Sequence, residues 1–191
     1  VPILSGTSLA GALRARALRI AKTVALNDIA DQFIDDLFGK RICSSTDEPT
    51  ASRLIIAETE IASPLDLVHS RVKIDRFTGG SFPTALFSDQ PVYGKIDTAI
   101  IVKINIQQPC DAHIGLMLLL LKDLWTGDLP IGGEISVGRG RLAGQKATLT
   151  YMRAAALQQW VIEQADEHLQ VNGDRNLLES FVGAFIKEMQ I

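Results

Sequence analysis

The chain has 191 residues, 47% of them hydrophobic, so it can bury a sizeable core, and it fits one domain with a peripheral extension better than two equal domains. Its formal net charge of −3 argues against a non-specific nucleic-acid binder, for which a basic domain is expected. Two lone cysteines, Cys43 and Cys110, without a C-x-x-C motif or a secretory leader, exclude a disulfide framework and a cysteine-based zinc site and point to the cytoplasm. The longest apolar run, residues 114–121, is far shorter than the roughly 20 residues that span a bilayer, so we expect no membrane role.

Residues 8–26 are predicted to form a helix, because apolar residues recur on one face from Leu9 to Val24. The entrance to this helix is Ser5-Gly6-Thr7-Ser8, whose hydroxyl and backbone N–H groups lie at the positive helix end and suit a phosphate. A plain helix cap explains the same residues. The basic residues of the helix form a separate stripe: Arg16, Arg19 and Lys22.

The remaining elements are predicted from periodicity and from turn residues. They are an acidic helix ending near Gly39, a polar loop over 43–50, strands over 53–61, 67–76 and 98–106, and an apolar helix over 112–125. Residues 131–142 turn into a strand pair that ends near Tyr151, and residues 153–189 have a helical pattern broken at Asn172-Gly173. Residues 77–94 read as an irregular excursion, too long for a tight hairpin, and such excursions are more often functional than accidental.

The strand over 67–76 alternates apolar and ionisable residues. Val68, Ser70, Val72 and Ile74 share the side expected to pack, whereas His69, Arg71, Lys73 and Asp75 share the outward side, and the strand runs into Gly79-Gly80. Basic groups occur in three blocks, namely the first helix, residues 71–76 and residues 139–146, on an otherwise acidic chain. This distribution predicts a surface that grips one defined anionic ligand. An ordinary solvated sheet face is the alternative.

Gly138-x-Gly140-x-x-Ala143 matches a dinucleotide-binding fingerprint only formally. The residues that follow it are strand-like, whereas that motif must open a helix, so we reject a dinucleotide site. A glycine loop with Arg139 and Arg141 remains, and it can approach a sugar-phosphate backbone closely. A plain β-turn explains it equally well.

Four motifs in this order carry a resemblance: residues 2–14, Leu37-Phe38-Gly39, residues 71–80 with Ala85-Leu86-Phe87, and Gly132-Gly133 leading to residues 138–142. Together they resemble the RAMP superfamily, and within it the backbone subunits of type III CRISPR effector complexes, over roughly residues 1–150. The resemblance implies an α+β fold with a ferredoxin-like, RRM-like sheet in a domain over 1–151, a protruding thumb at 77–94, and a helical extension over 152–191. The implied partners are CRISPR guide RNA, target RNA, and other effector subunits or like domains stacked along the guide.

The resemblance also implies roles for residues. Guide-RNA phosphates would be held by Ser5, Gly6, Thr7, Ser8 and Arg14, and the RNA backbone would be touched by Arg139 and Arg141. The thumb that wedges between nucleotides would include Arg71, Lys73, Arg76, Phe77, Thr78, Gly79 and Gly80. Phosphate and 2′-hydroxyl contacts of this kind leave base edges free for pairing.

Two departures limit what carries over from the family: one affects a phosphate contact and the other affects catalysis. Ala10 stands where relatives often carry a lysine or arginine, and relatives have an opening strand and loop before the position of Val1. In target-cleaving relatives that loop carries the aspartate that cuts target RNA. We therefore expect no catalytic residue in this chain. We also expect no metal site, because no histidine–carboxylate pair stands at ligand spacing, and no cofactor, whereas a full complex could use divalent metal for target cleavage.

Two alternatives stay open. A CRISPR RNA-processing endonuclease would use His69 as its base, because His113 opens an apolar helix and His168 lies in the acidic tail. Asp75 is a poor acid, since the nearby Arg71, Lys73 and Arg76 favour its ionised form. The second alternative is a protein–protein adaptor whose working surface is the helical tail.

Overall fold

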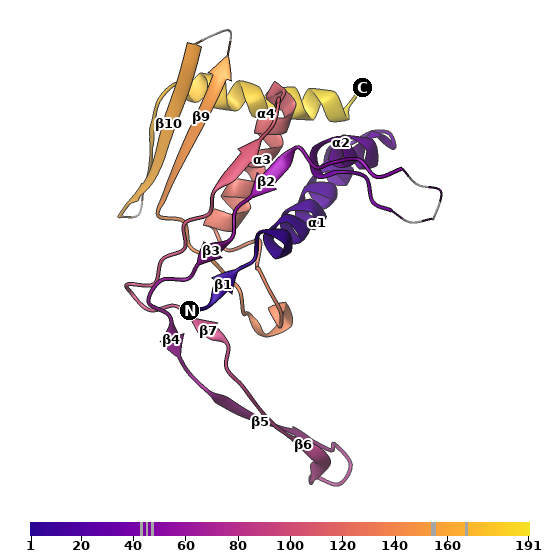
Figure 1. Cartoon of the computed structure of the whole chain (residues 1–191), viewed down its shortest axis with the longest axis vertical. Coiled ribbons are helices and arrows are strands. Elements are labelled where there is room, and N and C mark those ends of the chain that lie inside the picture. The colour runs from indigo at the N-terminus through magenta and orange to yellow at the C-terminus, as the bar shows by residue number, and fades with distance from the viewer. Residues whose placement is uncertain (43, 45, 47, 154–155, 167) are drawn as a thin grey trace. The chain divides into compact units, whose positions relative to one another are not determined.

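A computed structural model describes residues 1–42, 44, 46, 48–153, 156–166 and 168–191. The described residues form a mixed α+β structure with two compact units (Figure 1). The first unit comprises Val1–Gly6 and Ala57–Lys103, and the second comprises Thr7–Ile56 and Ile104–Ile191. Each unit is described below by itself. No helix among the described residues is long and apolar enough to cross a membrane.

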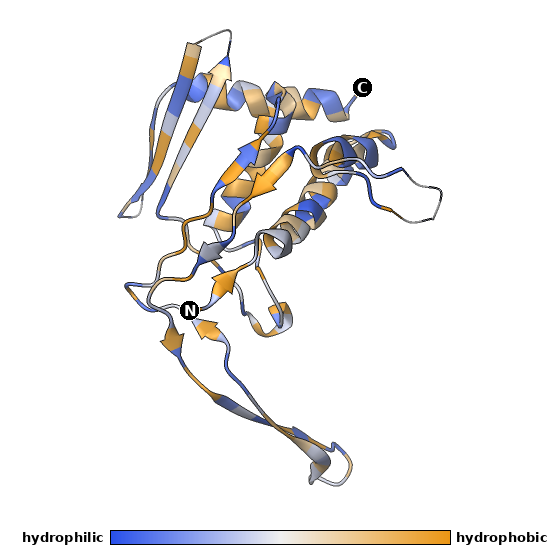
Figure 2. Ribbon diagram, in the orientation of Figure 1, coloured by the Kyte–Doolittle hydropathy of each residue, from blue (hydrophilic) through white to orange (hydrophobic). Residues whose placement is uncertain are grey.

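Helices supply most of the core of the second unit. They are α1 (Gly6–Val24), α2 (Ile29–Phe38), α3 (Asp111–Trp125) and α4 (Arg175–Met189). The apolar stripe of α1 is buried, because Leu9, Leu13, Ala17 and Ala21 are almost wholly inaccessible. Figure 2 shows hydrophobic and hydrophilic residues interspersed along the helices. The helices expected at 8–26 and 112–125, and the acidic helix ending before Gly39, are confirmed within a few residues.

Helices α3 and α4 pack closely because α3 carries a glycine at their contact. A Cβ atom at Gly115 would lie 2.1 Å from the carbonyl oxygen of Phe181. The Phe181 ring in turn meets Trp160 edge-on, with ring centroids 5.9 Å apart. These aromatic side chains, together with Ile114, form a buried cluster between the helices and the neighbouring sheet.

That sheet replaces an expected helical segment. Strands β9 (Lys146–Arg153), β10 (Ala156–Ala165) and β11 (His168–Asn172) form an antiparallel sheet in the order β11-β10-β9. The expectation of a helical extension over 152–191 is therefore wrong before α4, and its expected boundary at residue 151 falls inside β9. Trp160 and Ile162 are both buried with Val161 less so between them, which is the period of two of a strand. Residues 154, 155 and 167 of the expected extension lie outside the described residues.

The other predicted strands are only partly correct. Strand β2 (Leu54–Ile56) pairs with β8 (Ile104–Ile106), so the expected strand over 98–106 forms only at its end. Residues 131–142 contain a 3₁₀ turn, Ile135–Val137, in place of an expected strand. Within the described ranges the strands pair in separate small sheets, and a single ferredoxin-like sheet is not confirmed. Residues 43, 45 and 47 of the expected polar loop are outside the described part.

The first unit consists of paired strands. Strand β1 (Ile3–Leu4) pairs with β3 (Thr59–Glu60), and β4 (Leu65–Asp66) pairs with β7 (Val92–Tyr93). Strand β5 (His69–Ile74) pairs with β6 (Ser81–Asp89). We call residues 65–93 the arm; it ends in the turn at 75–80 (Figure 1). The irregular excursion expected over 77–94 is therefore wrong, because most of it is a strand that folds back on β5 with Ile74 opposite Ser81.

Candidate nucleic-acid interface

One face of the arm combines cations with aromatic rings. Lys73 Nζ lies 4.8 Å from the centroid of the Phe82 ring, and Arg71 stands opposite Phe87 in the β5–β6 register. Arg71 also forms an ion pair with Asp89 at 3.5 Å. Grooves that bind single-stranded nucleic acid use this combination, because cations contact phosphates while rings stack on bases.

The tip of the arm is a turn organised by Asp75. Its backbone N–H donates to the Gly80 carbonyl and its carbonyl accepts from the Gly79 N–H, both at 2.9 Å. Its carboxylate accepts hydrogen bonds from the Phe77 N–H at 3.1 Å and from Thr78 Oγ1 at 2.7 Å. Gly79 has a φ of 70°, in the left-handed region that favours glycine. These bonds give residues 75–80 a defined conformation.

The same bonds settle the protonation state of Asp75. The hydrogen bond from Thr78, followed by the one from the Phe77 N–H, lowers the pKa of this carboxyl below its ordinary value. The expected direction is therefore confirmed. The expected cause, attraction by neighbouring arginine and lysine side chains, is replaced by hydrogen bonding within the turn.

The turn presents one cation and one aromatic ring to solvent. Phe77 is 99% exposed. Arg76 is exposed too, and its side chain has no hydrogen-bond or ion-pair partner in the described part of the chain. The turn therefore holds the Phe77 ring in water, where its apolar surface is open to contact with another molecule.

The apolar side of β5 does not pack as expected. Val72 and Ile74 are 49% and 60% exposed, and Leu86, which stands opposite Val72, is 74% exposed. The physical reason is that the β5–β6 ribbon has only two strands and no further layer of its own unit covers this side. Both faces of the arm are thus available for contacts.

His69 is occupied by an aromatic neighbour. Its ring stacks on Tyr93 with centroids 5.4 Å apart, and its Nε2 lies 3.3 Å from the Tyr93 hydroxyl. Asp89 is its register partner on β6. The structure thus places His69 at the base of the β5–β6 hairpin, away in sequence from the turn that carries Arg76 and Phe77.

Basic residues of α1 are engaged by acidic residues of the same unit. The Arg14 guanidinium forms an ion pair with Asp35 and donates to the carbonyl of Gly39. Arg16 Nε lies 2.7 Å from the buried carboxylate of Asp123. The stripe expected on this helix therefore serves packing at these positions, and the RNA contact expected of Arg14 stays a prediction that competes with its ion pair.

The entrance of α1 keeps some features of an anion site. The helix begins at Gly6, and its first turn contains no acidic residue. Thr7 and Ser8 are exposed, whereas Gly6 is buried. Backbone N–H groups at such an end favour anions. The expected role of Ser5, Gly6, Thr7 and Ser8 is compatible with this geometry and stays a prediction.

The glycine loop of the second unit is closed by a backbone hydrogen bond. The Ile131 N–H donates to the Gly140 carbonyl at 2.9 Å. A Cβ atom at Gly140 would lie 2.0 Å from the Ile131 carbonyl oxygen, so the close approach requires glycine. Arg141 is exposed, whereas Arg139 forms an ion pair with Glu134. Of the two expected contacts, Arg141 is thus the better placed for an anion.

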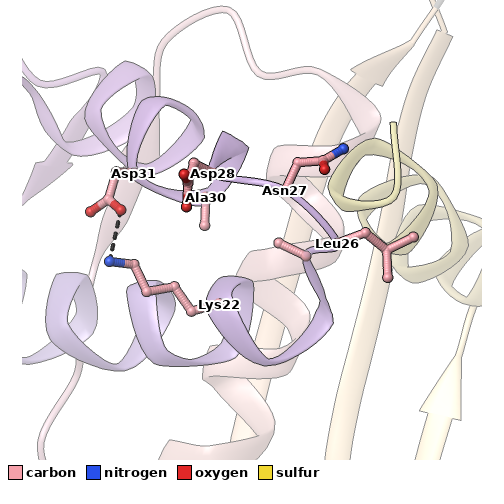
Figure 3. Close-up of a pocket in the computed structure, with 7 residues that line it drawn as sticks. Lys22, Leu26, Asn27, Asp28, Ala30 and Asp31 are labelled. Carbon is pink, nitrogen blue, oxygen red and sulfur yellow. Dashed lines mark ion pairs between the residues drawn. The ribbon is translucent and has the colours of Figure 1, made fainter.

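A hollow of about 470 Å³ lies where α1 turns into α2. Its charged lining residues are Lys22, Asp28 and Asp31, and Lys22 Nζ lies 2.7 Å from Asp31 Oδ2 (Figure 3). Because the hollow is lined by two carboxylates and by one lysine that is already paired, its charge does not favour the binding of a phosphate. Within the described ranges, no three His, Cys, Asp or Glu side chains are grouped as metal ligands.

Sequence reasoning missed two aromatic residues of the interface. Phe82 and Phe87 lie on β6, inside the stretch interpreted as irregular. A signal for this strand is present in the sequence. A glycine pair is followed directly by the stretch from Ser81 to Asp89, which carries an aromatic residue near each end. Pro83 obscured this signal, because proline inside a run argues against a central strand, although it is tolerated in an edge strand such as β6.

The arm residues Arg71, Lys73, Arg76, Phe77, Thr78, Gly79 and Gly80 are brought together on one hairpin, while Arg14, Arg139 and Arg141 belong to the second unit. No curated protein matches the chain. The family model of the RAMP superfamily matches residues 1–143, which include the α1 entrance, the whole arm and the glycine loop. Because that match extends over more than half of the sequence, the chain belongs to the RAMP superfamily.

Proposed function

We propose that this protein is a CRISPR RNA-binding backbone subunit of a type III RNA-guided antiviral effector complex, which holds guide RNA for pairing with target RNA. Membership of the RAMP superfamily implies a CRISPR-associated RNA-binding role. The observation that carries the finer proposal is the arm tip, where hydrogen bonds to Asp75 hold an exposed arginine beside a phenylalanine that is 99% exposed.

The chemistry of the arm suits RNA of any sequence. Arg71, Lys73 and Arg76 supply cations for phosphates, and Phe77 supplies a ring that can stack on a base or separate two bases. Neither contact reads the hydrogen-bonding edge of a base. A guide held in this way keeps its edges for pairing with target RNA.

The exposed apolar side of the arm supports assembly with other effector subunits. An isolated two-stranded ribbon is marginally stable in water, and the side chains of Val72, Ile74 and Leu86 are largely solvated in the chain alone. Covering them stabilises an assembly by about 25 cal/mol for each Å² of apolar surface removed from water. Neighbouring subunits stacked along the guide would supply such a cover.

The proposal assigns binding, and not cleavage, to the residues of this chain. A processing endonuclease is the second candidate, because the His69 Nε2 to Tyr93 hydroxyl contact of 3.3 Å places an imidazole beside a phenol in the arm.

Binding of guide RNA to the purified chain tests the proposal. Arg76→Ala should weaken binding equally for two guides with unrelated spacers and should reduce the log–log salt slope by roughly 0.7, the value for one phosphate contact on a single strand. Phe77→Ala should weaken binding by about 1–3 kcal/mol while leaving the salt slope unchanged, because stacking releases no counterion. Arg175→Ala, which removes an exposed arginine at the start of α4, is the matched control and should change neither quantity.

The outcomes separate the candidate functions. Losses that depend on spacer sequence, or an equal loss in Arg175→Ala, would contradict the backbone role. An absence of salt-dependent affinity would favour the adaptor. Metal-independent cutting that His69→Ala slows by about 10²–10⁴-fold would establish the endonuclease, since that is the usual cost of losing a general base.

A further inference from the structure

A cysteine and a histidine meet at the start of α3, in the second unit. Cys110 is the N-cap residue of this helix, and it is exposed. His113, three positions later, is 2% exposed. The Cys110 sulfur accepts the backbone N–H of His113, and the His113 ring accepts the backbone N–H of Cys110, so the two residues cap the helix reciprocally.

The hydrogen bonds fix which ring nitrogen is basic. The Cys110 N–H donates to His113 Nδ1 at 3.3 Å, so the neutral ring has its lone pair at Nδ1 and its proton at Nε2. The Cys110 sulfur lies 3.2 Å from the same Nδ1. On the far side of the ring, Nε2 lies 3.3 Å from Asp36 Oδ2 on α2. Nε2 makes no hydrogen bond to a described residue, and Asp36 Oδ2 accepts one from Arg53 at 2.9 Å, so the carboxylate acts on the ring through its charge.

We propose that Cys110 is a nucleophilic thiol that exchanges with small soluble disulfides, with His113 as the proton acceptor and Asp36 as the carboxylate whose charge stabilises the imidazolium. A nucleophile within hydrogen-bond reach of a base is an arrangement that activates thiols. The sulfur also lies at the N-terminus of a helix of 15 residues. This site is independent of the RNA-binding function proposed above.

Burial keeps the His113 imidazole in its neutral form. Burial, the largest influence, lowers the pKa of His113 despite the neighbouring Asp36, and Arg53 acts in the same direction as burial, while Glu188 opposes it. The ring therefore stays neutral near pH 7 and can accept a proton. On the solvent side, Asp111 is adjacent to the cysteine and accepts from Arg153 at 3.0 Å and from the Tyr151 hydroxyl at 3.4 Å.

The exchange step balances without a further oxidant. The thiol proton moves from sulfur to His113 Nδ1, and the sulfur electron pair attacks one sulfur of the small disulfide. The S–S bond of the reagent breaks as the new S–S bond to Cys110 forms. The leaving thiolate takes a proton from the imidazolium, which returns the ring to its neutral form. Cys110 is oxidised and one sulfur of the reagent is reduced.

Oxidised glutathione, reacted with the full chain, is the probe. Cys43→Ser removes the second cysteine, and intact mass then follows the gain of one glutathionyl group at Cys110. An ordinary thiol is only a few per cent ionised at pH 7, so a neighbouring base can raise its reaction rate. A less basic thiolate is also a weaker nucleophile, which offsets part of this gain in rate. We therefore expect oxidised glutathione to react about tenfold faster with the folded chain than with the urea-unfolded chain. The advantage should vanish above the ordinary thiol pKa of about 8.5.

Two variants separate activation from simple exposure. His113→Gln should bring the folded rate at pH 7 down to the unfolded rate, and Asp36→Asn, at a half-exposed side chain, should lower it in the same direction if His113→Gln does not fold. Equal rates in the folded and unfolded chain would overturn the proposal. It would also be overturned if the folded His113→Gln or Asp36→Asn variant kept the full rate. Guide-RNA affinity of the glutathionylated chain is measured in parallel and should be unchanged, so failure of either proposal is recognised separately.

Discussion

The ion pair between Arg16 and Asp123 offers the sharpest test of how α1 uses its basic residues. Arg16 Nε lies 2.7 Å from Asp123 Oδ2, and the two side chains are 26% and 5% exposed. Lys122 Nζ contacts the other carboxylate oxygen at 3.1 Å from a largely solvated position. Arg16→Met keeps an unbranched apolar stem and the helix propensity of the side chain but leaves the Asp123 carboxylate with Lys122, its solvated partner.

The expected cost is large. Removing one partner of a buried pair typically destabilises a protein by 3–5 kcal/mol, and because Lys122 remains we expect about 3 kcal/mol, the lower end. For a chain of this size that loss lowers Tm by roughly 6–12 °C. Lys22→Met on the same helix is the control, because the Lys22 and Asp31 side chains are 53% and 60% exposed (Figure 3) and such pairs contribute about 0–1 kcal/mol.

Urea unfolding monitored by tryptophan fluorescence measures both variants, since Trp125 and Trp160 lie in the second unit together with the pair. Burial alone would raise the pKa of Asp123, but hydrogen bonds from Arg16 and Lys122 hold it below 3.8. The pair therefore contributes stability above that pH and loses it as the pH falls through the folded-state pKa, so the deficit of Arg16→Met should shrink in acid. A deficit within about 0.5 kcal/mol of that of Lys22→Met would refute the reasoning.

Three further predictions concern single positions. Gly115→Ala should destabilise the second unit by about 1–3 kcal/mol in urea unfolding, because its Cβ would lie 2.1 Å from the Phe181 carbonyl oxygen. Gly183 has open space around it, so Gly183→Ala should stabilise α4 by up to about 1 kcal/mol. The free energy of unfolding should fall as the pH drops below 6.5, because burial lowers the pKa of His113 in the folded chain and the unfolded chain then binds the proton more readily. His113→Gln should flatten the slope of unfolding free energy against pH between pH 7.5 and 5.5. The control His168→Gln, at an exposed position, should leave that slope unchanged. Asp75→Ala should weaken guide-RNA binding although it removes a negative charge, since the turn loses the acceptor for Phe77 and Thr78; tighter binding in a salt titration would show that charge matters more than turn geometry.

Helices with a narrow apolar stripe were predictable from the sequence. The stripe of α1 and the apolar run of α3 fix both helices, and Gly39, with a φ of 85°, follows the end of α2. The partners of the polar face were not predictable. Asp123 follows Arg16 by 107 residues, and a local sequence pattern cannot predict a contact at that separation. From the sequence alone, an arginine that forms a structural ion pair therefore cannot be distinguished from one that binds phosphate.

The C-terminal strands show tertiary packing that overrides local propensity. Residues 156–165 include glutamines, alanines and a glutamate, which favour helix, and the sequence was interpreted accordingly. The decisive feature is Trp160, which is 1% exposed, packs on Phe181 and donates its indole N–H to the Asp174 carbonyl at 2.8 Å. Those partners lie on or beside α4, later in the chain, so the strand is stabilised by contacts that a window of ten residues does not contain.

The arm shows the same limit for a functional surface. The alternation from His69 to Ile74 correctly predicts a strand, and it correctly separates a basic face from an apolar one. The alternation shows that the two faces of the strand differ in polarity, but it does not predict which other elements cover either face. In a larger sheet the apolar face would be core, whereas in this ribbon Ile74 is 60% exposed and both faces meet solvent. From an amphipathic strand whose apolar side is left exposed by the described residues we therefore infer a contact with another subunit, and in this protein that strand leads into the structured turn that presents Phe77.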